Sequence, residues 1–272
     1  MIRLAVRCPP ELGERVLAEL LVLAPGGVEE DEGEGYVEYA IYGAPGELPE
    51  LGALAAEVEG GSIEVTSEEI PDDWTDRWRD FHRPIVVGDR LVVAPSWEEV
   101  PDSGPLERIV VDPGQAFGTG AHATTRMCLE LLIELAASGE AQGALTDWGT
   151  GSGVLAIAAA KLGFAPVSGC DHELAAIAAA GENAAANGVE IALERRNLRT
   201  GPAPAAPTAT ANLTAPVLLE VAARLGEAPE RLVCSGLLAR EADEVAGAFA
   251  AHGFAERRRL GDGDWAALLL AR

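Results

Sequence analysis

The sequence predicts an α/β protein in two parts: a Rossmann-like sheet with a C-terminal antiparallel hairpin, preceded by a small ferredoxin-like α+β domain. Three observations support this prediction. From residue 84 onward, short apolar strands alternate with helical segments, which is typical of parallel sheets. A Gly-Asp-Gly-Asp turn at 261–264 separates two strand-like runs and indicates a hairpin over 254–270. Before residue 71, the runs follow the order β-α-β-β-α-β.

The first domain is expected over residues 1–70. It begins with a strand, IRLAVRC, and a helix over 11–24 whose apolar residues recur at helical spacing. Two short strands follow around glycine turns, then a second helix over 47–60 and a last strand over 62–70. The connector at 71–83 is predicted to be a linker helix with three aromatic side chains on one face.

The second domain is expected over residues 84–272. A hairpin turns at Gly88-Asp89, and helices are predicted over 124–138, 153–163, 173–188 and 240–253. Strands are predicted between them. The segment 199–211 should supply a central strand, but it is rich in proline and has almost no large apolar residues. The sequence therefore predicts an interruption at this point of the sheet.

The chain is strongly acidic, with 272 residues and a formal net charge of −24. Such a field repels phosphate backbones, so we expect no direct contact with nucleic acid. Residues 1–70 hold sixteen acidic side chains against three arginines, a net charge of −13. This concentration suits the capture of a basic protein, or it serves only solubility.

The composition also limits the class of protein and its expected location. Hydrophobic residues make up 48% of the chain, which excludes wholesale disorder, and no run of eighteen apolar residues is present to span a membrane. The N-terminus turns polar within ten residues, so a cytoplasmic location is expected. The four cysteines and four histidines show no ligand spacing, and no metal site is predicted. A monomer is expected.

The motif DWGTGSG lies between a predicted strand and a predicted helix. Glycines at Gly149, Gly151 and Gly153 allow a sharp turn close to a ligand, and the helix start offers free N–H groups. Asp147 is placed to meet a cationic amine and would repel a pyrophosphate. Asp171 ends the next strand, where a carboxylate can bind a ribose diol. S-adenosyl-L-methionine carries both an ammonium group and a ribose, so it satisfies both demands.

Two other interpretations stay open on these residues alone. The spacing Gly151-x-Gly153-x-x-Ala156 also fits the loose dinucleotide-binding pattern. A glycine-rich turn can also occur without any ligand.

Two further signals lie near this motif. The run VDPGQAFGTGAHATTR at 111–126 predicts a loop over the ligand, with Phe117, Gly118 and His122, followed by a helix capped by Thr124 or Thr125. The residue Asn212, in ANLTAP, follows the expected fourth strand. An asparagine at that place holds the acceptor nitrogen in many adenosylmethionine enzymes, or it caps a helix.

These motifs resemble the ribosomal protein L11 methyltransferase family. The resemblance covers residues 70–272 and rests on DPGQAFGTGAHATTRMCLELL, DWGTGSGVLAIAAAKLG, GCD, NAAANGV, ANLTAP, CSGLL and GDWAALLL. It implies a seven-stranded methyltransferase sheet, whose terminal antiparallel hairpin distinguishes it from the all-parallel sheets of dehydrogenases. It also implies S-adenosyl-L-methionine as cofactor, with contacts at Thr125, Gly149, Asp171 and Asn212. The N-terminal domain would then recognise the basic L11 protein, whose amines are methylated.

Three departures from the family pattern are visible. Thr150 stands where the family commonly has cysteine, and Ala123 stands where proline is usual, which should loosen the loop. The strand before Asn212 lacks the apolar, Asp-containing run of the family. If that strand is frayed, Asn212 is poorly placed.

The residues and the resemblance together predict an S-adenosylmethionine-dependent protein N-methyltransferase acting on the α-amine or lysines of L11. The carbonyl oxygen of Asn212 would orient the acceptor amine. His122 is the candidate general base, or it stabilises the loop by hydrogen bonding. The alternatives are a divergent enzyme acting on another protein or a small amine, and a cofactor-binding protein without turnover.

Overall fold

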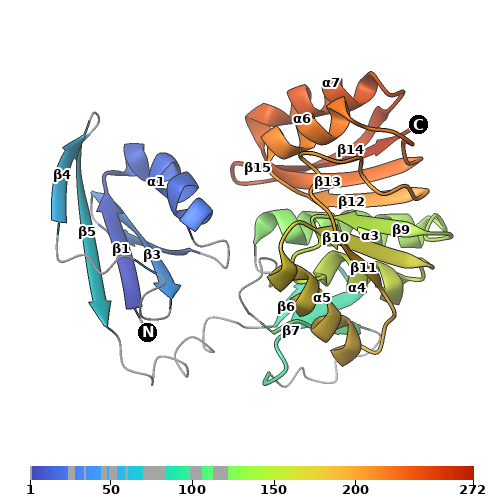
Figure 1. Ribbon diagram of the computed structural model, residues 1–272, viewed down its shortest axis with the longest axis horizontal. Helices are drawn as coiled ribbons and strands as arrows, with labels where there is room; N and C mark the ends of the chain where they lie inside the picture. The colour runs from blue at the N-terminus through green and yellow to red at the C-terminus, as the bar shows by residue number, and fades with distance from the viewer. Residues whose placement is uncertain are drawn as a thin grey trace. The chain divides into compact units, whose positions relative to one another are not determined.

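The computed structural model describes residues 2–23, 28–33, 35–43, 48, 54–58, 61–69, 84–98, 106–112 and 122–272. The chain divides into two compact units, Met1–Phe81 and His82–Arg272 (Figure 1). The linker helix expected at 71–83 lies outside the described residues. None of the described helices is long and apolar enough to cross a membrane.

In its described residues, the N-terminal unit is an antiparallel sheet with a helix against one face (Figure 1). The strands lie in the order β2-β3-β1-β5-β4. Their bounds are β1 Ile2–Cys8, β2 Glu29–Gly33, β3 Tyr36–Gly43, β4 Leu54–Val58 and β5 Gly61–Glu69, and the helix α1 spans Pro10–Leu23. Leu12, Val16 and Leu20 of α1 recur at helical spacing, and they pack on apolar residues of β1 and β3 to form this unit's core.

The second helix expected over 47–60 is wrong for residues 54–58, which form β4. This strand pairs antiparallel with β5, with Leu54 opposite Val65 and Val58 opposite Gly61. The pairing satisfies backbone N–H and C=O groups that β5 would otherwise expose at the sheet edge, and it outweighs the helical preference of the sequence Leu-Ala-Ala-Glu. The described residues thus show four successive strands after α1.

The second unit is built on a seven-stranded mixed sheet in the order β11-β10-β9-β12-β13-β15-β14 (Figure 1). The parallel strands are β9 Leu145–Trp148, β10 Val167–Asp171, β11 Ala192–Arg195, β12 Thr208–Asn212 and β13 Arg231–Leu238. The strand β15, Trp265–Ala271, is antiparallel to β13 and to β14, Ala255–Asp262. The α/β class expected from the alternating pattern is confirmed.

Helices cover both faces of this sheet. The first apolar cluster joins α3 Ala123–Ala137 and α4 Val154–Leu162, with Ala184 of α5 Leu174–Ala186. The second cluster contains α6 Ala215–Ala223 and α7 Ala242–Ala250, the latter preceded by a 3-10 turn, η1 Ala239–Glu241. A small sheet of β6 Ile85–Val87, β7 Leu91–Ala94 and β8 Glu107–Val110 joins the first cluster.

The interruption expected at 199–211 is wrong at its end, because residues 208–212 form the central strand β12. Ala209 and Ala211 are fully buried, and their small side chains fit beneath α6. The proline-rich crossover before β12 is also anchored. The indole N–H of Trp148 donates to the Pro204 carbonyl at 3.1 Å, and Leu198 belongs to the second cluster. Threonine favours strands, so β12 forms without large apolar residues.

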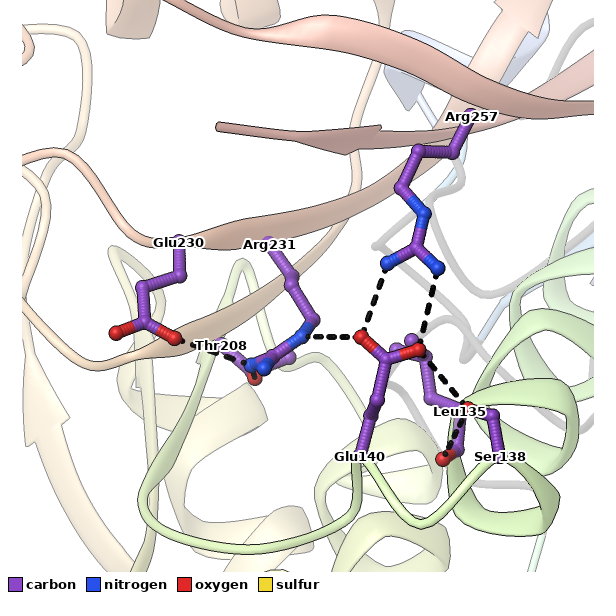
Figure 2. A network of polar contacts seen from close by, with 7 residues as sticks. All are labelled: Leu135, Ser138, Glu140, Thr208, Glu230, Arg231 and Arg257. Atoms are coloured by element: carbon purple, nitrogen blue, oxygen red, sulfur yellow. Dashed lines mark hydrogen bonds and ion pairs between the residues drawn. The ribbon is translucent and has the colours of Figure 1, made fainter.

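A charge network joins the turn after α3 to β13 and β14 (Figure 2). The Glu140 carboxylate accepts hydrogen bonds from Arg231 Nε and Arg257 Nη1, each at 2.9 Å. Arg231 also lies 3.4 Å from the Glu230 carboxylate and 3.4 Å from Thr208 Oγ1. One carboxylate therefore connects three segments that are far apart in the sequence.

Candidate cofactor site

The carboxyl ends of β9, β10 and β12 meet at one edge of the seven-stranded sheet. β10 lies on one side of β9 and β12 on the other, so the strand order reverses between β9 and β12. In open α/β sheets, ligands bind at such a switch point. The loop 149–153, Asp171 and Asn212 all lie at these strand ends.

Glycine is required in the loop that connects β9 to α4. Gly149, Gly151 and Gly153 have φ angles of 75°, 52° and 84°, in the left-handed region. A Cβ atom on Gly149 would lie 2.4 Å from Leu213 Cδ2, and one on Gly153 would lie 3.1 Å from Ala180 Cβ. The loop is therefore a sharp turn that depends on its three glycines, as the motif predicted, at the N-terminus of α4.

The Asp171 carboxylate is fixed at the end of β10 by backbone donors. Oδ2 accepts from the N–H of Gly151 at 3.0 Å, and Oδ1 accepts from the N–H of Glu173 at 3.1 Å. His172 Nδ1 lies 3.2 Å from Oδ1. A carboxylate has about four lone-pair positions, so Asp171 keeps capacity for the two hydroxyls of a diol. Its side chain is largely buried, and it links the glycine loop to α5.

Asp147 lies beneath the loop. The residue is 1% exposed, Oδ2 accepts from Thr150 Oγ1 at 2.8 Å, and Oδ1 accepts from Thr210 Oγ1 at 2.6 Å. Burial raises its pKa to about 6, although these hydroxyls and the N–H of Ala156 oppose the rise. The structure thus buries the Asp147 carboxylate against Thr150 and Thr210, whereas the sequence predicted that it would contact the ammonium group of the ligand directly.

Asn212 and Thr125 are brought together from 87 residues apart. Asn212 Nδ2 donates to Thr125 Oγ1 at 3.2 Å, which connects the end of β12 to the first turn of α3. The amide N–H₂ is engaged, so the carbonyl oxygen is the acceptor that remains for a bound donor. Asn212 does not cap α6, whose N-cap is Thr214.

His122 is the N-cap of α3, so the expected cap at Thr124 or Thr125 is wrong. Nδ1 of His122 accepts from the Thr124 N–H at 3.3 Å and lies 2.8 Å from Thr124 Oγ1. The ring stacks edge-to-face with Trp265 at 4.9 Å. Burial, assisted by Arg126, lowers the pKa of His122, which favours the neutral imidazole. Its loop-stabilising role is therefore visible.

Two predicted site residues, Phe117 and Gly118, lie in 113–121, outside the described residues. One buried residue at the site, Thr210, escaped the sequence analysis, as did Trp148, which anchors the crossover before β12. The alternation of Thr208 and Thr210 was the available signal for Thr210, because residues two apart in a strand share a face. Within the described ranges, no group of three or more His, Cys, Asp or Glu side chains could hold a metal ion.

The mixed seven-stranded sheet, with its antiparallel hairpin and the glycine loop at its switch point, places this unit in the Rossmann-like methyltransferase fold class. The sequence profile of the family described as "Ribosomal protein L11 methyltransferase (PrmA)" matches residues 39–272. The chain belongs to this family, as the motifs predicted. Its members use S-adenosyl-L-methionine as methyl donor.

Similar proteins carry the same description. The chain is 39% identical over 207 residues to the ribosomal protein L11 methyltransferase of Heliobacterium modesticaldum, covering 74% of this chain and 64% of that protein. It is 44% identical over 179 residues to the one from Symbiobacterium thermophilum, covering 64% of this chain and 57% of that protein. The chain thus spans less than two thirds of the length of these two relatives.

A solved structure shows the same fold. The crystal structure of a ribosomal protein L11 methylase from Lactobacillus delbrueckii subsp. bulgaricus is similar with a TM-score of 0.61 and 31% sequence identity. The likeness covers 70% of this chain and 99% of the other.

The residues present fit the family's cofactor. A Cβ atom on Gly149 would clash with the side chain of Leu213, so only glycine lets the loop lie this close to the residue after Asn212. The two anchored oxygens of Asp171 suit a ribose diol, and Asn212, held by Thr125, lies at the end of β12 on the other side of β9. This set offers oxygen acceptors rather than a cluster of cations for a pyrophosphate.

Proposed function

We propose that this chain transfers methyl groups from S-adenosyl-L-methionine to amino groups of ribosomal protein L11. The observation that carries the proposal is the convergence of the glycine loop, Asp171 and the Asn212–Thr125 pair at the switch point of the sheet. Asp171 would hold the ribose hydroxyls, and Gly149, Gly151 and Gly153 would line the rest of the cofactor. Membership of the family supports the choice of reaction and substrate.

When bound, the cofactor supplies a methyl group on a sulfonium sulfur, and the thioether that leaves needs no protonation. The chain must therefore align the acceptor and exclude water. The acceptor must be a neutral amine. At pH 7, removing a proton from a lysine with a pKa near 10.4 costs on the order of 4–5 kcal/mol, and from an α-amine near 7.7–8.0 about 1 kcal/mol. We propose the α-amine as the easier acceptor, with lysines requiring a desolvating pocket.

Two side chains have proposed roles in the transfer. The carbonyl oxygen of Asn212 would accept a hydrogen bond from the amine and direct its lone pair at the methyl group. His122 has a lowered pKa and is therefore available as a neutral base for the released proton. Nδ1 accepts the cap hydrogen bond from Thr124, so the neutral ring carries its hydrogen on Nε2, and Nδ1 is the atom proposed to take this proton.

We propose that residues 1–70 recognise the substrate, that 71–83 form the linker and that 84–272 form the catalytic domain. The sheet face opposite α1 supports the first role. The register places Asp31, Glu38, Glu64 and Glu68 on this face, because they pair with residues that do not contact α1. The two arginines of β1 contact Glu38, and Arg3 also contacts Glu68, but two cations do not balance the four acidic side chains, so this face stays acidic and suits a basic protein.

We also propose that the protein is a cytoplasmic monomer, and that its net negative charge keeps it from direct contact with nucleic acid.

A salt series on L11 methylation tests the acidic face. Exposed charges are screened over about 8–10 Å at 0.1–0.15 M salt, so the KM for L11 should rise with added salt. The matched neutral variant Glu64→Gln/Glu68→Gln should show a higher KM and a flatter salt response. If the KM for L11 does not change with salt in either protein, the acidic face does not capture L11 and its charge serves only solubility.

The function itself is tested with purified L11 and methyl-labelled S-adenosyl-L-methionine. Label should enter L11, and blocking its α-amine by acetylation should remove most of it. A small amine and an unrelated basic protein serve as controls. Cofactor binding without label in L11 would refute the proposal, and label in the controls alone would show a divergent substrate.

A further inference from the structure

A buried hydroxyl on β12 connects the Asn212 end of that strand to the glycine loop. Thr210 precedes Asn212 by two residues, and its Oγ1 donates to Asp147 Oδ1 at 2.6 Å. On the other oxygen, Asp147 accepts from Thr150 Oγ1 at 2.8 Å. Thr210 is 0%, Asp147 1% and Thr150 4% exposed. One carboxylate thus joins β9, the loop and β12 through two hydroxyl donors.

The sheet is arranged around this contact. Thr210 lies opposite Asp147 in the parallel pair β9–β12, and Gly169 lies opposite Asp147 in the pair β9–β10. A Cβ atom on Gly169 would lie 2.9 Å from Thr150 Oγ1. The absence of a side chain at Gly169 therefore leaves the space through which Thr150 reaches the carboxylate.

The hydroxyl of Thr210 is not explained by strand formation. Valine has nearly the same shape, favours strands equally and would suit a buried central position. A buried carboxylate, in contrast, requires donors, because its desolvation is costly when it lacks them. Thr146, on β9, provides the comparison. Its hydroxyl is buried without a hydrogen-bond partner among the residues that the structure describes, so a valine there should change little.

We propose that Thr210 is a positioning residue for methyl transfer: through Asp147, its hydroxyl fixes the Asn212 end of β12 relative to the glycine loop. Cofactor and acceptor amine are bound by these two segments in the proposed function, on which this inference rests. An error in their relative placement would lower the rate as well as the affinity, because methyl transfer requires in-line alignment.

Three variants test the proposal by calorimetric binding of S-adenosyl-L-methionine and by methyl transfer to L11. Thr210→Val should weaken cofactor binding by about 5- to 20-fold and lower kcat as well, since it removes a hydrogen bond to a charged group. Thr210→Ser, which keeps the hydroxyl, should return both values to within about threefold of wild type. Thr146→Val should match wild type in both.

The pH profile gives a measurement that a purely structural role would not change. Asp147 interacts electrostatically with Asp171 and is close to the thiols of Cys128 and Cys170, both of which burial keeps protonated. Its remaining donors are Thr150 and the N–H of Ala156. Losing the Thr210 donor should raise the pKa of Asp147. The pH below which the affinity for the cofactor falls should therefore move upward by about one to two units.

The outcomes separate cleanly. The inference is overturned if Thr210→Val binds and turns over like wild type, if Thr210→Ser is as impaired as Thr210→Val, or if Thr146→Val is equally impaired. Should Thr210→Val fail to fold, Thr150→Val removes the second donor from the loop side and must show the same loss of affinity. Failure of the wild-type protein to bind S-adenosyl-L-methionine would instead refute the proposed function.

Discussion

Replacing Glu140 by glutamine should destabilise the second unit by about 1–2 kcal/mol at pH 7 without changing cofactor affinity. Glu140 receives two hydrogen bonds from Arg257, at 2.9 and 3.2 Å, and one from Arg231 at 2.9 Å (Figure 2). These guanidinium groups, Arg257 foremost, lower its pKa from 4.5 to about 2. Glutamine keeps the shape but removes the charge that both arginines contact.

The magnitude follows from the pKa and the exposure. A fall from 4.5 to about 2 corresponds to about 3.4 kcal/mol if all of it favours the folded state. The side chains of Glu140 and Arg257 are 24% and 48% exposed, so solvent screening reduces the value to the range given above. Because the folded-state pKa is the lower one, this stabilisation is complete above about pH 4.5 and disappears as the pH falls toward 2.

Urea unfolding of wild type and Glu140→Gln between pH 7 and pH 3 measures the effect. The difference in unfolding free energy should be largest at pH 7 and less than half of that at pH 3. Glu134→Gln is the matched control, because Glu134 contacts Arg258 at the longer distance of 3.5 Å and the side chains of both residues are about half exposed. Equal stability of wild type and Glu140→Gln, or a difference that ignores pH, would refute the reasoning.

Two further predictions concern the site. Asp171→Ala should weaken S-adenosyl-L-methionine binding at least about tenfold in calorimetry, since a bidentate contact with a diol is worth roughly 1.5–3 kcal/mol; an unchanged Kd, or preferred binding of NAD, would contradict the assignment. Ala123→Pro should raise the Tm by about 1–3 °C. Ala123 is the first residue of α3, and His122, with φ −69° and ψ 140°, already has the backbone that a following proline requires; a lowered Tm would count against this.

Elements with a strong local pattern could be predicted, and those decided by long-range pairing could not. The apolar spacing in α3 and the alternation around Gly88 gave both elements correctly. The run 54–58 has helix-forming residues, but the exposed edge of β5 decides its structure. β12 has little apolar content, and it forms because β13 pairs with all five of its residues and β9 with the first three.

The site shows the same division. The glycine loop and Asp171 could be predicted because backbone turns and strand ends leave a mark in the sequence. The burial of Asp147 could not, because it depends on Thr150 and on Thr210, which lies 63 residues away. His122 was expected in the loop, but its place as the N-cap depends on where α3 begins, and helix ends are set by hydrogen bonds rather than by composition.

Trp148 explains how a proline-rich crossover can take the place of a helix between β11 and β12. Its side chain is fully buried, packs in the cluster that contains Leu198, and donates to the Pro204 carbonyl. Trp148→Phe would leave that carbonyl without its N–H donor and open a small cavity, so we expect a loss of about 2–3 kcal/mol in unfolding free energy. Trp97→Phe, at a partly exposed position away from the crossover, should cost less than about 1 kcal/mol. Similar losses in the two variants would mean that the crossover does not depend on Trp148.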